Sequence, residues 1–212
     1  MESTVWRPEN LSDELGVLLG QFHACFTNQV SASLGSDDWR TSMHTVSNID
    51  IASVQKSALN CIEQIEIKLK NNAYSCLNSM ELSGPEINFL IDDVFRPGCI
   101  RSEIYQELNG VLSHLVSTST CASEYLSVVQ KHSGVGGLFR GLLKGYSDPV
   151  DGLSHAVGKG SSQAEVQTYQ QKFQMNASLV TQSIDSITNN LKALTLHKWN
   201  TGVELIVEKS KP

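Results

Sequence analysis

Residues 173–194 read FQMNASLVTQSIDSITNNLKAL, and their apolar side chains recur at alternating steps of four and three residues. The positions are Phe173, Ala177, Val180, Ile184, Ile187, Leu191 and Leu194. A repeat of 3.5 residues keeps an apolar seam facing a neighbouring helix, whereas a period of 3.6 residues would let the seam drift around the helix. The stretch therefore predicts a long α-helix that packs against other helices.

Three earlier segments carry the same spacing. The first runs through Leu11, Leu15, Leu18, Phe22, Cys25 and Ala32, the second through Ala58, Ile62, Ile65, Leu69 and Cys76, and the third through Ile104, Leu108, Val111, Leu115, Thr118, Ala122, Tyr125 and Val129. Gln29 and Asn72 are polar interruptions of the first two seams. Apolar residues beside the seams widen each stripe, as a bundle core requires. We therefore predict an all-α fold: an antiparallel bundle of four long helices with coiled-coil-like heptad packing and short helices in the later connections.

Turn and capping residues divide the chain into helices within one predicted domain, residues 1–212. Ser83-Gly84-Pro85-Glu86 has the spacing of a capping box, with proline at the first helical position, and Ser162 and Glu165 repeat that spacing before the last helix. The expected helices span residues 10–34, 48–81, 85–95, 100–132, 137–146, 149–158 and 163–199. The tail at 202–208 is compatible with a strand or with the frayed end of a helix.

Composition narrows the classes of partner and the expected compartment. The net charge is −6 and no dense stripe of Lys and Arg is present, so nucleic acid is not an expected partner. The five cysteines are widely spaced without a CxxC pair, which indicates reduced thiols. The chain shows no secretory signal and no apolar run near the roughly 18 residues of a membrane span. We expect a soluble protein made in the cytoplasm, with signal-less export left open.

No pattern of residues predicts a cofactor, a metal site or an enzyme. None of the six histidines lies in HExxH or in a zinc-type spacing with cysteine. Glu63, Glu66 and Lys70 have the spacing of a solvated charged face on a helix. The enzymatic alternative is a cysteine hydrolase whose nucleophile and base come from distant segments, such as Cys121 and His155.

One segment, residues 134–160, breaks the heptad pattern: GVGGLFRGLLKGYSDPVDGLSHAVGKG contains eight of the chain's fifteen glycines. A helix over residues 137–146 would be amphipathic and cationic. Its candidate contact residues are Leu138, Phe139, Arg140, Leu142, Leu143, Lys144 and Tyr146. Such a helix is suited to lie in the headgroup layer of a membrane or against a partner. The structural alternative is a glycine-rich connection that closes one end of the bundle.

These observations leave three hypotheses of function. The leading hypothesis is a non-enzymatic helical interaction module that binds a protein partner, self-associates, or docks reversibly on a membrane through residues 137–146. The second is a small α-helical pore-forming or membrane-disrupting protein, an effector or toxin, whose 134–160 hairpin inserts into the bilayer. The third is the cysteine–histidine hydrolase.

Overall fold

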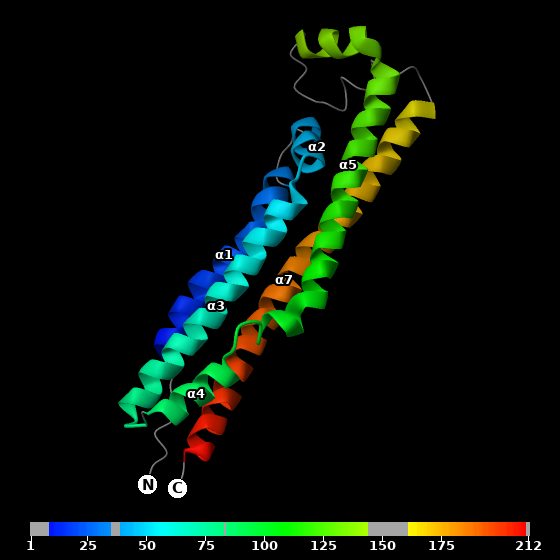
Figure 1. Cartoon of the computed structure of the whole chain (residues 1–212). Helices are drawn as coiled ribbons and strands as arrows, with labels where there is room; N and C mark the ends of the chain where they lie inside the picture. The colour runs from blue at the N-terminus through cyan, green and yellow to red at the C-terminus, as the bar shows by residue number, and fades with distance from the viewer. Residues whose placement is uncertain (1–8, 35–38, 83, 144–160, 211–212) are drawn as a thin grey trace. The chain divides into compact units, whose positions relative to one another are not determined.

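The computed structural model describes the backbone of residues 9–34, 39–82, 84–143 and 161–210, and side chains within residues 13–30, 43–82, 84–128 and 167–210. Every regular element in these backbone ranges is a helix, and the same ranges contain no strand (Figure 1). The all-α class predicted from the sequence is therefore confirmed.

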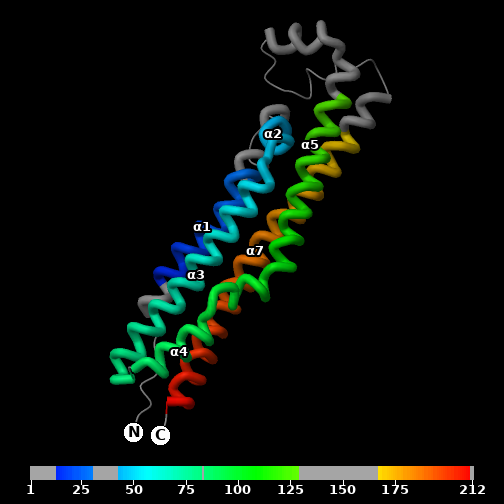
Figure 2. The backbone as a smooth tube through the Cα atoms, viewed as in Figure 1, coloured from blue at the N-terminus to red at the C-terminus, as the bar shows by residue number. Residues whose placement is uncertain are grey.

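Four of the helices in the described residues are long and two are short. In chain order they are α1 (Glu9–Leu34), α2 (Trp39–Ser47), α3 (Ile51–Ser79), α4 (Pro85–Val94), α5 (Arg101–Leu143) and α7 (Ser161–Lys209). Figure 2 traces this order along the backbone by colour. The four long helices are those that carry the apolar seams of the sequence.

A short helix, α2, occupies a stretch for which the sequence predicted no helix. The next helix, α3, begins at Ile51, three residues later than predicted. The Asp50 carboxylate explains this start, because it accepts a hydrogen bond from the Ser53 backbone N–H at 3.1 Å. A carboxylate in this position satisfies one of the unpaired N–H groups at the beginning of a helix.

Both of the last long helices extend further than predicted. α5 does not end at residue 132 but continues to Leu143, so the glycines at 134–137 do not separate two helices. A helical glycine costs only about 1 kcal/mol relative to alanine, and the flanking residues of a long helix can offset that cost. α7 includes residues 202–208 and ends at Lys209, so this tail is helical. The predicted helix at 149–158 lies outside the described residues.

The start of α4 follows the prediction in part. Pro85 is the first helical residue, as the Ser83–Glu86 motif predicted. The N-cap, however, is Gly84, which has no side chain to bond the helix, so the predicted capping box is not what begins α4. Ser83 itself lies outside the described residues. The second predicted capping residue, Ser162, lies inside the first turn of α7 rather than before it.

By backbone contacts the chain divides into two compact units, and each unit takes segments from the same long helices. The first comprises residues 1–25, 54–108 and 185–212, and the second comprises residues 26–53 and 109–184. The single domain expected from the sequence stays a prediction.

The first unit has an apolar core supplied by α1, α3, α4, α5 and α7. Its largest buried side chains include Phe22, Ile62, Ile65, Leu69, Leu77, Ile91, Phe95 and Ile100. Near the end of α7, the Trp199 ring lies 6.0 Å from the Phe95 ring, centroid to centroid. A Cβ added at Gly202 would lie 2.7 Å from Phe95 Cζ and 2.8 Å from Val94 Cγ1. Glycine at this position therefore lets α7 approach the end of α4 closely.

The second unit is built around a cluster in which α2 participates. Its buried members are Met43, Val46, Ala122, Tyr125, Phe173 and Ala177, with Ile49, Leu126 and Tyr169 packed against them. These residues come from α2, α5 and α7 and from the turn after α2. The missed helix α2 thus supplies two of the buried side chains.

Burial agrees closely with the seams predicted in α5 and α7. In α5 all seven seam positions from Ile104 to Tyr125 are buried, and the side chain of Val129 lies outside the described ones. In α7 the positions from Phe173 to Leu191 are buried and Leu194 is half-buried. Beyond Leu191 the buried face of α7 moves to Thr195 and then to Trp199, in steps of four residues.

The buried face of α1 differs from the predicted one. Leu15 and Phe22 are buried as expected, but the other buried residues are Leu19, Phe26 and Val30, while Leu18, Cys25 and Gln29 are half-buried. Both faces contain Leu15 and Phe22, so the spacing alone does not separate them. Burying Leu19, Phe26 and Val30 removes more apolar surface from water than burying Leu18, Cys25 and Gln29, which favours the observed face.

Candidate functional site

The residues predicted to contact a membrane or a partner lie at the end of α5 and beyond it. The backbone of residues 137–143 is helical, as the prediction requires for that part. The side chains of Leu138, Phe139, Arg140, Leu142 and Leu143 are not among those described, and Lys144 and Tyr146 lie outside the described backbone. The contact role of this segment stays a prediction.

In the described residues the most organised polar group is Glu66 of α3, in the first unit. The sequence indicated a solvated face for Glu63, Glu66 and Lys70; this is wrong for Glu66, which is only 6% exposed. Glu63 is exposed, and the Lys70 ammonium pairs with Asp92 of α4 at 2.8 Å. A buried carboxylate requires hydrogen-bonded partners, and Glu66 has three of them.

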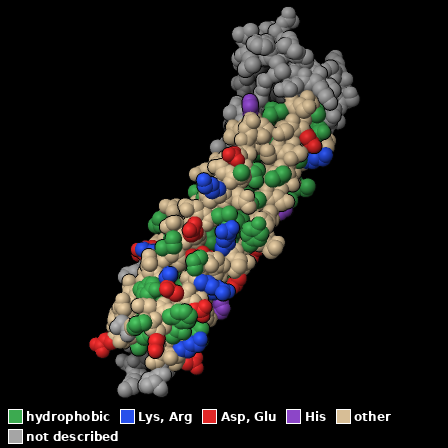
Figure 3. Space-filling model, viewed as in Figure 1, with side chains coloured by type: hydrophobic (Ala, Val, Ile, Leu, Met, Phe, Trp, Pro, Cys, Tyr) green, Lys and Arg blue, Asp and Glu red, His purple; other side chains and the backbone are tan. Residues whose placement is uncertain are grey.

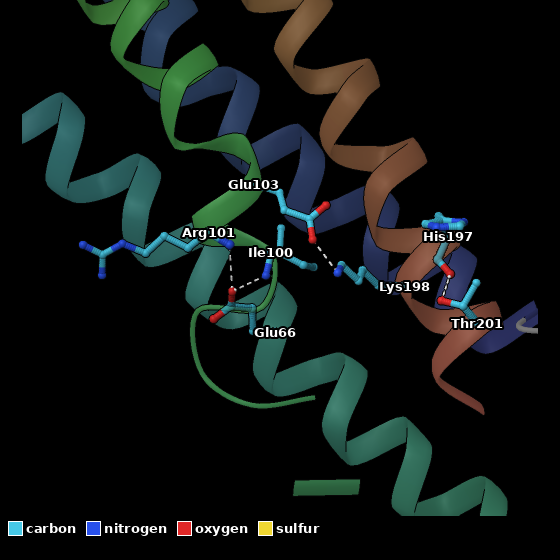
Figure 4. A network of polar contacts seen from close by, with 7 residues as sticks. All are labelled: Glu66, Ile100, Arg101, Glu103, His197, Lys198 and Thr201. Atoms are coloured by element: carbon cyan, nitrogen blue, oxygen red, sulfur yellow. Dashed lines mark hydrogen bonds and ion pairs between the residues drawn. The ribbon is translucent and has the colours of Figure 1, made fainter. Parts of the chain in front are cut away.

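The Glu66 carboxylate accepts three backbone N–H bonds from the end of the α4–α5 connection and the first residue of α5. Figure 4 shows the two that come from Ile100 and Arg101. Gly98 donates to Oε2 at 2.8 Å, while Ile100 and Arg101 donate to Oε1 at 2.8 and 2.9 Å. Arg101 is the first residue of α5. Glu66 therefore caps α5 from another helix, where the negative charge also lies near the positive end of the helix dipole.

The local chain geometry makes this cap possible. Gly98 has a φ of 85°, in the left-handed region that glycine adopts without steric penalty. The turn brings the N–H groups of three nearby residues toward one carboxylate. The sequence does contain a signal for the burial of Glu66, because this residue lies four positions after Ile62 and three before Leu69, on the apolar side of α3.

Further polar contacts connect α5 with α7 beside this cap. Figure 4 shows the Lys198 ammonium against the Glu103 carboxylate, an ion pair between the two helices. One turn further along α5, the Glu107 carboxylate accepts a hydrogen bond from the Asn190 amide at 2.8 Å. Thr201 donates back to the His197 carbonyl within α7 at 2.9 Å. The first two of these contacts join α5 to α7, and the third lies within α7.

A second set of polar contacts lies around Asp92, at the surface of the first unit. The Asp92 carboxylate accepts a hydrogen bond from the Tyr74 hydroxyl at 2.6 Å and pairs with the Lys70 ammonium. The hydrogen bond from Lys70 is the main cause that lowers the pKa of Asp92, followed by the hydrogen bond from Tyr74. The same bond raises the pKa of the Tyr74 hydroxyl. The hydrogen bond therefore favours the ionised carboxylate of Asp92 and the protonated hydroxyl of Tyr74.

The cysteines bear on the hydrolase hypothesis. Burial raises the pKa of Cys25 to about 11 and that of Cys76 to about 11. Burial, and then the negative charge of Glu66, raise the pKa of Cys99. A thiol nucleophile works through a lowered pKa, so these three thiols have the opposite property.

Cys121, proposed to pair with His155, has a different neighbour. Its Sγ accepts a hydrogen bond from the Asn176 amide at 3.1 Å, within the second unit. His155 lies outside the described residues, so the pair itself is untested. The five thiols are free, with no disulfide between them.

The described residues include neither a metal-binding cluster nor a helix that could span a membrane. They contain no group of three or more His, Cys, Asp or Glu side chains placed to hold a metal ion. No helix among them has both the length and the apolar character required to cross a bilayer.

Comparison of the chain with protein-family models, with curated proteins and with solved structures found no match.

Proposed function

We propose that this chain is a non-enzymatic helical interaction module. In this proposal α1, α3, α5 and α7 form an antiparallel bundle with heptad-type seams. The remaining helical surface binds a protein partner or a second copy, and residues 137–146 dock reversibly on an anionic membrane.

The observation that carries the proposal is that the buried polar side chains form hydrogen bonds with the backbone of the chain itself. Among the described side chains only one charged residue, Glu66, is buried, and its carboxylate is occupied by three backbone N–H groups. The buried threonines, Thr118 and Thr195, donate to carbonyls of their own helices. These three buried groups thus serve the fold, which favours a protein that acts through its surface.

Two features of α5 support a membrane role for its end. The helix continues through Leu143, and an amphipathic face requires a helical backbone. In the sequence, Leu138 and Leu142 are four residues apart, which is about one turn of a helix. Arg140 adds positive charge in a chain whose net charge is −6, so the predicted docking segment differs in sign from the molecule as a whole.

The expected strength of docking is modest. Full burial of Leu138, Phe139 and Leu142 would contribute about 1.5–3 kcal/mol for each side chain, an upper limit for a helix that lies only in the headgroup layer. Arg140 and Lys144 add about 1 kcal/mol each on an anionic surface. Ordering of the segment offsets part of this sum, so binding is expected to be weak and reversible.

The test is co-sedimentation of the full chain with vesicles of phosphatidylcholine alone and of phosphatidylcholine with phosphatidylserine. We expect binding to the anionic vesicles that weakens with added salt. The triple variant Leu138→Ser, Phe139→Ser, Leu142→Ser should lose it. A matched control replaces three exposed apolar residues elsewhere by serine: Val17, Phe89 and Met175, which are 63%, 73% and 62% exposed.

The outcomes separate the alternatives. Loss of binding only in the first variant supports docking through α5, whereas equal loss in both variants contradicts it. Release of a trapped dye from the same vesicles would favour the pore-forming protein over the docking module. Absence of binding to anionic vesicles, together with a monomeric mass by light scattering, would contradict both the membrane and the self-association parts of the proposal.

A further inference from the structure

Two thiols in the first unit lie against one another across two helices. Cys25 Sγ of α1 is 3.9 Å from Cys61 Sγ of α3, close enough for one thiol to donate to the other. Cys61 is buried at 9% exposed and Cys25 is half-buried. Cys25 also donates to the Gln21 carbonyl at 3.2 Å within α1. The sequence placed these residues 36 positions apart and gave no sign of a pair.

The separation is small enough for a covalent bond after a local rearrangement. A disulfide has an S–S length of about 2.05 Å, so the sulfurs must approach by about 1.9 Å. Rotation of each side chain about its Cα–Cβ bond moves Sγ by a distance of this size. No movement of one unit relative to the other is required, because both cysteines belong to the first unit.

We propose that Cys25 and Cys61 form a reversible intramolecular disulfide, which joins α1 covalently to α3 under oxidising conditions. The bond would fix α1 on the core of the first unit. This inference concerns the first unit alone and does not rest on the proposed membrane or partner binding.

The other three thiols have neighbours of a different kind. Cys76 Sγ lies 3.8 Å from Met80 Sδ, and a thioether does not form a disulfide. Cys121 Sγ accepts a hydrogen bond from Asn176. Burial, and then the nearby negative charge of Glu66, raise the pKa of Cys99. Cys25 and Cys61 therefore differ from the other three cysteines because their sulfur atoms contact each other.

The oxidant required is a low-molecular-weight disulfide such as oxidised glutathione. The thiolate of one cysteine attacks a sulfur of that disulfide, which breaks its S–S bond and releases one small thiolate that takes up a proton. The thiolate of the second cysteine then attacks the protein sulfur of the mixed disulfide and releases the second small thiol. Two protein thiols are oxidised and one small disulfide is reduced to two thiols, and excess small thiol reverses the exchange.

Burial controls the rate of this exchange. Burial is the main cause of the raised pKa of Cys25, followed by its contact with Cys61, so the thiol is protonated at neutral pH. The reactive thiolate fraction increases about tenfold for each pH unit below a pKa of about 11. We therefore expect slow closure at neutral pH and faster closure at alkaline pH.

The experiment treats the full, reduced chain with oxidised glutathione at mildly alkaline pH and measures the intact mass and the cross-linked peptides. The expected product is a monomer that has lost two hydrogens and yields one peptide pair joining Cys25 to Cys61. Cys25→Ser and Cys61→Ser should each prevent this product, whereas Cys76→Ser should leave it unchanged. Circular dichroism of each variant shows that the helices are retained.

A melting experiment gives a second readout. The oxidised wild-type chain should unfold at a higher temperature than the reduced chain, and the difference should disappear in Cys25→Ser. Glutathione adducts without the internal bond, an intermolecular dimer, or a bond that includes another cysteine would each overturn the proposal. If Cys61→Ser fails to fold, Cys25→Ala at the more exposed position tests the same bond.

Discussion

At Glu66, one side chain completes the hydrogen bonding of a turn and of the first residues of a helix 32–35 positions away in the sequence. Without it, the N–H groups of Gly98, Ile100 and Arg101 would need other acceptors in a partly buried environment. An unpaired buried donor costs about 1–3 kcal/mol. The residue therefore contributes to stability through the groups that it satisfies.

We expect Glu66→Ala to lower the free energy of unfolding by about 2–4 kcal/mol, because it removes the acceptor and leaves a cavity. Glu66→Gln should cost less than Ala, because one amide oxygen remains to accept a hydrogen bond. Urea denaturation followed by circular dichroism measures both. The exposed neighbour Glu63→Ala is the control and should stay within about 0.5 kcal/mol of the wild type. Equal effects at both positions would refute the capping role.

A glycine pair offers a second test at single residues. Gly202→Ala should destabilise the chain by about 1–3 kcal/mol, since its Cβ would overlap Phe95 Cζ at 2.7 Å. Gly110→Ala, in a helix position with nothing within 4 Å, should be neutral or stabilising by up to about 1 kcal/mol. Thermal unfolding compares the two. A stabilising Gly202→Ala would show that α7 does not depend on this close approach.

At the scale of elements, the long helices could be predicted from their seams, but their faces and ends could not all be assigned. α5 and α7 have one dominant apolar stripe, and burial follows it. α1 has two overlapping stripes that share Leu15 and Phe22, so the spacing alone does not show which stripe is buried. α2 was missed because nine residues with only a few apolar positions do not establish a period.

The face of α1 can be tested directly. Leu19→Ala should cost about 2–4 kcal/mol in the free energy of unfolding, because Leu19 is buried. Leu18→Ala, on the face that the sequence favoured, should cost less because Leu18 is half-buried. Chemical denaturation of the two variants, with Val17→Ala as the exposed control, shows which variant loses more of the free energy of unfolding. The reverse order would restore the face expected from the sequence.

At the scale of the whole molecule, the fold class could be predicted from the sequence, but the candidate site could not. The all-α class followed from long periodic segments, which depend on local spacing. The contacts of Glu66 and of Cys25 depend on which helices become neighbours, which no local pattern specifies. Residues 137–146 are predicted from their composition to contact a membrane or a partner, and contacts within the chain do not test that prediction.

The overall charge leads to a prediction about partners. On the face shown in Figure 3, acidic and basic side chains are interspersed over the described surface. With a net charge of −6, we expect the full chain to leave the mobility of duplex DNA unchanged in a gel-shift measurement, even at low salt. Retardation that weakens as salt increases would reveal a basic surface and contradict the assignment of partners.

The cap that Glu66 provides also has a consequence for the order of folding during synthesis. A helix nucleus is unfavourable until its first turn is formed, and a capping acceptor lowers that barrier. Ribosomal synthesis makes α3 before α5, so the acceptor for the first turn of α5 already exists when Arg101 leaves the ribosome. Folding of α3 first would supply a template on which α5 starts, whereas α5 folding alone would begin with its N-terminal donors unpaired.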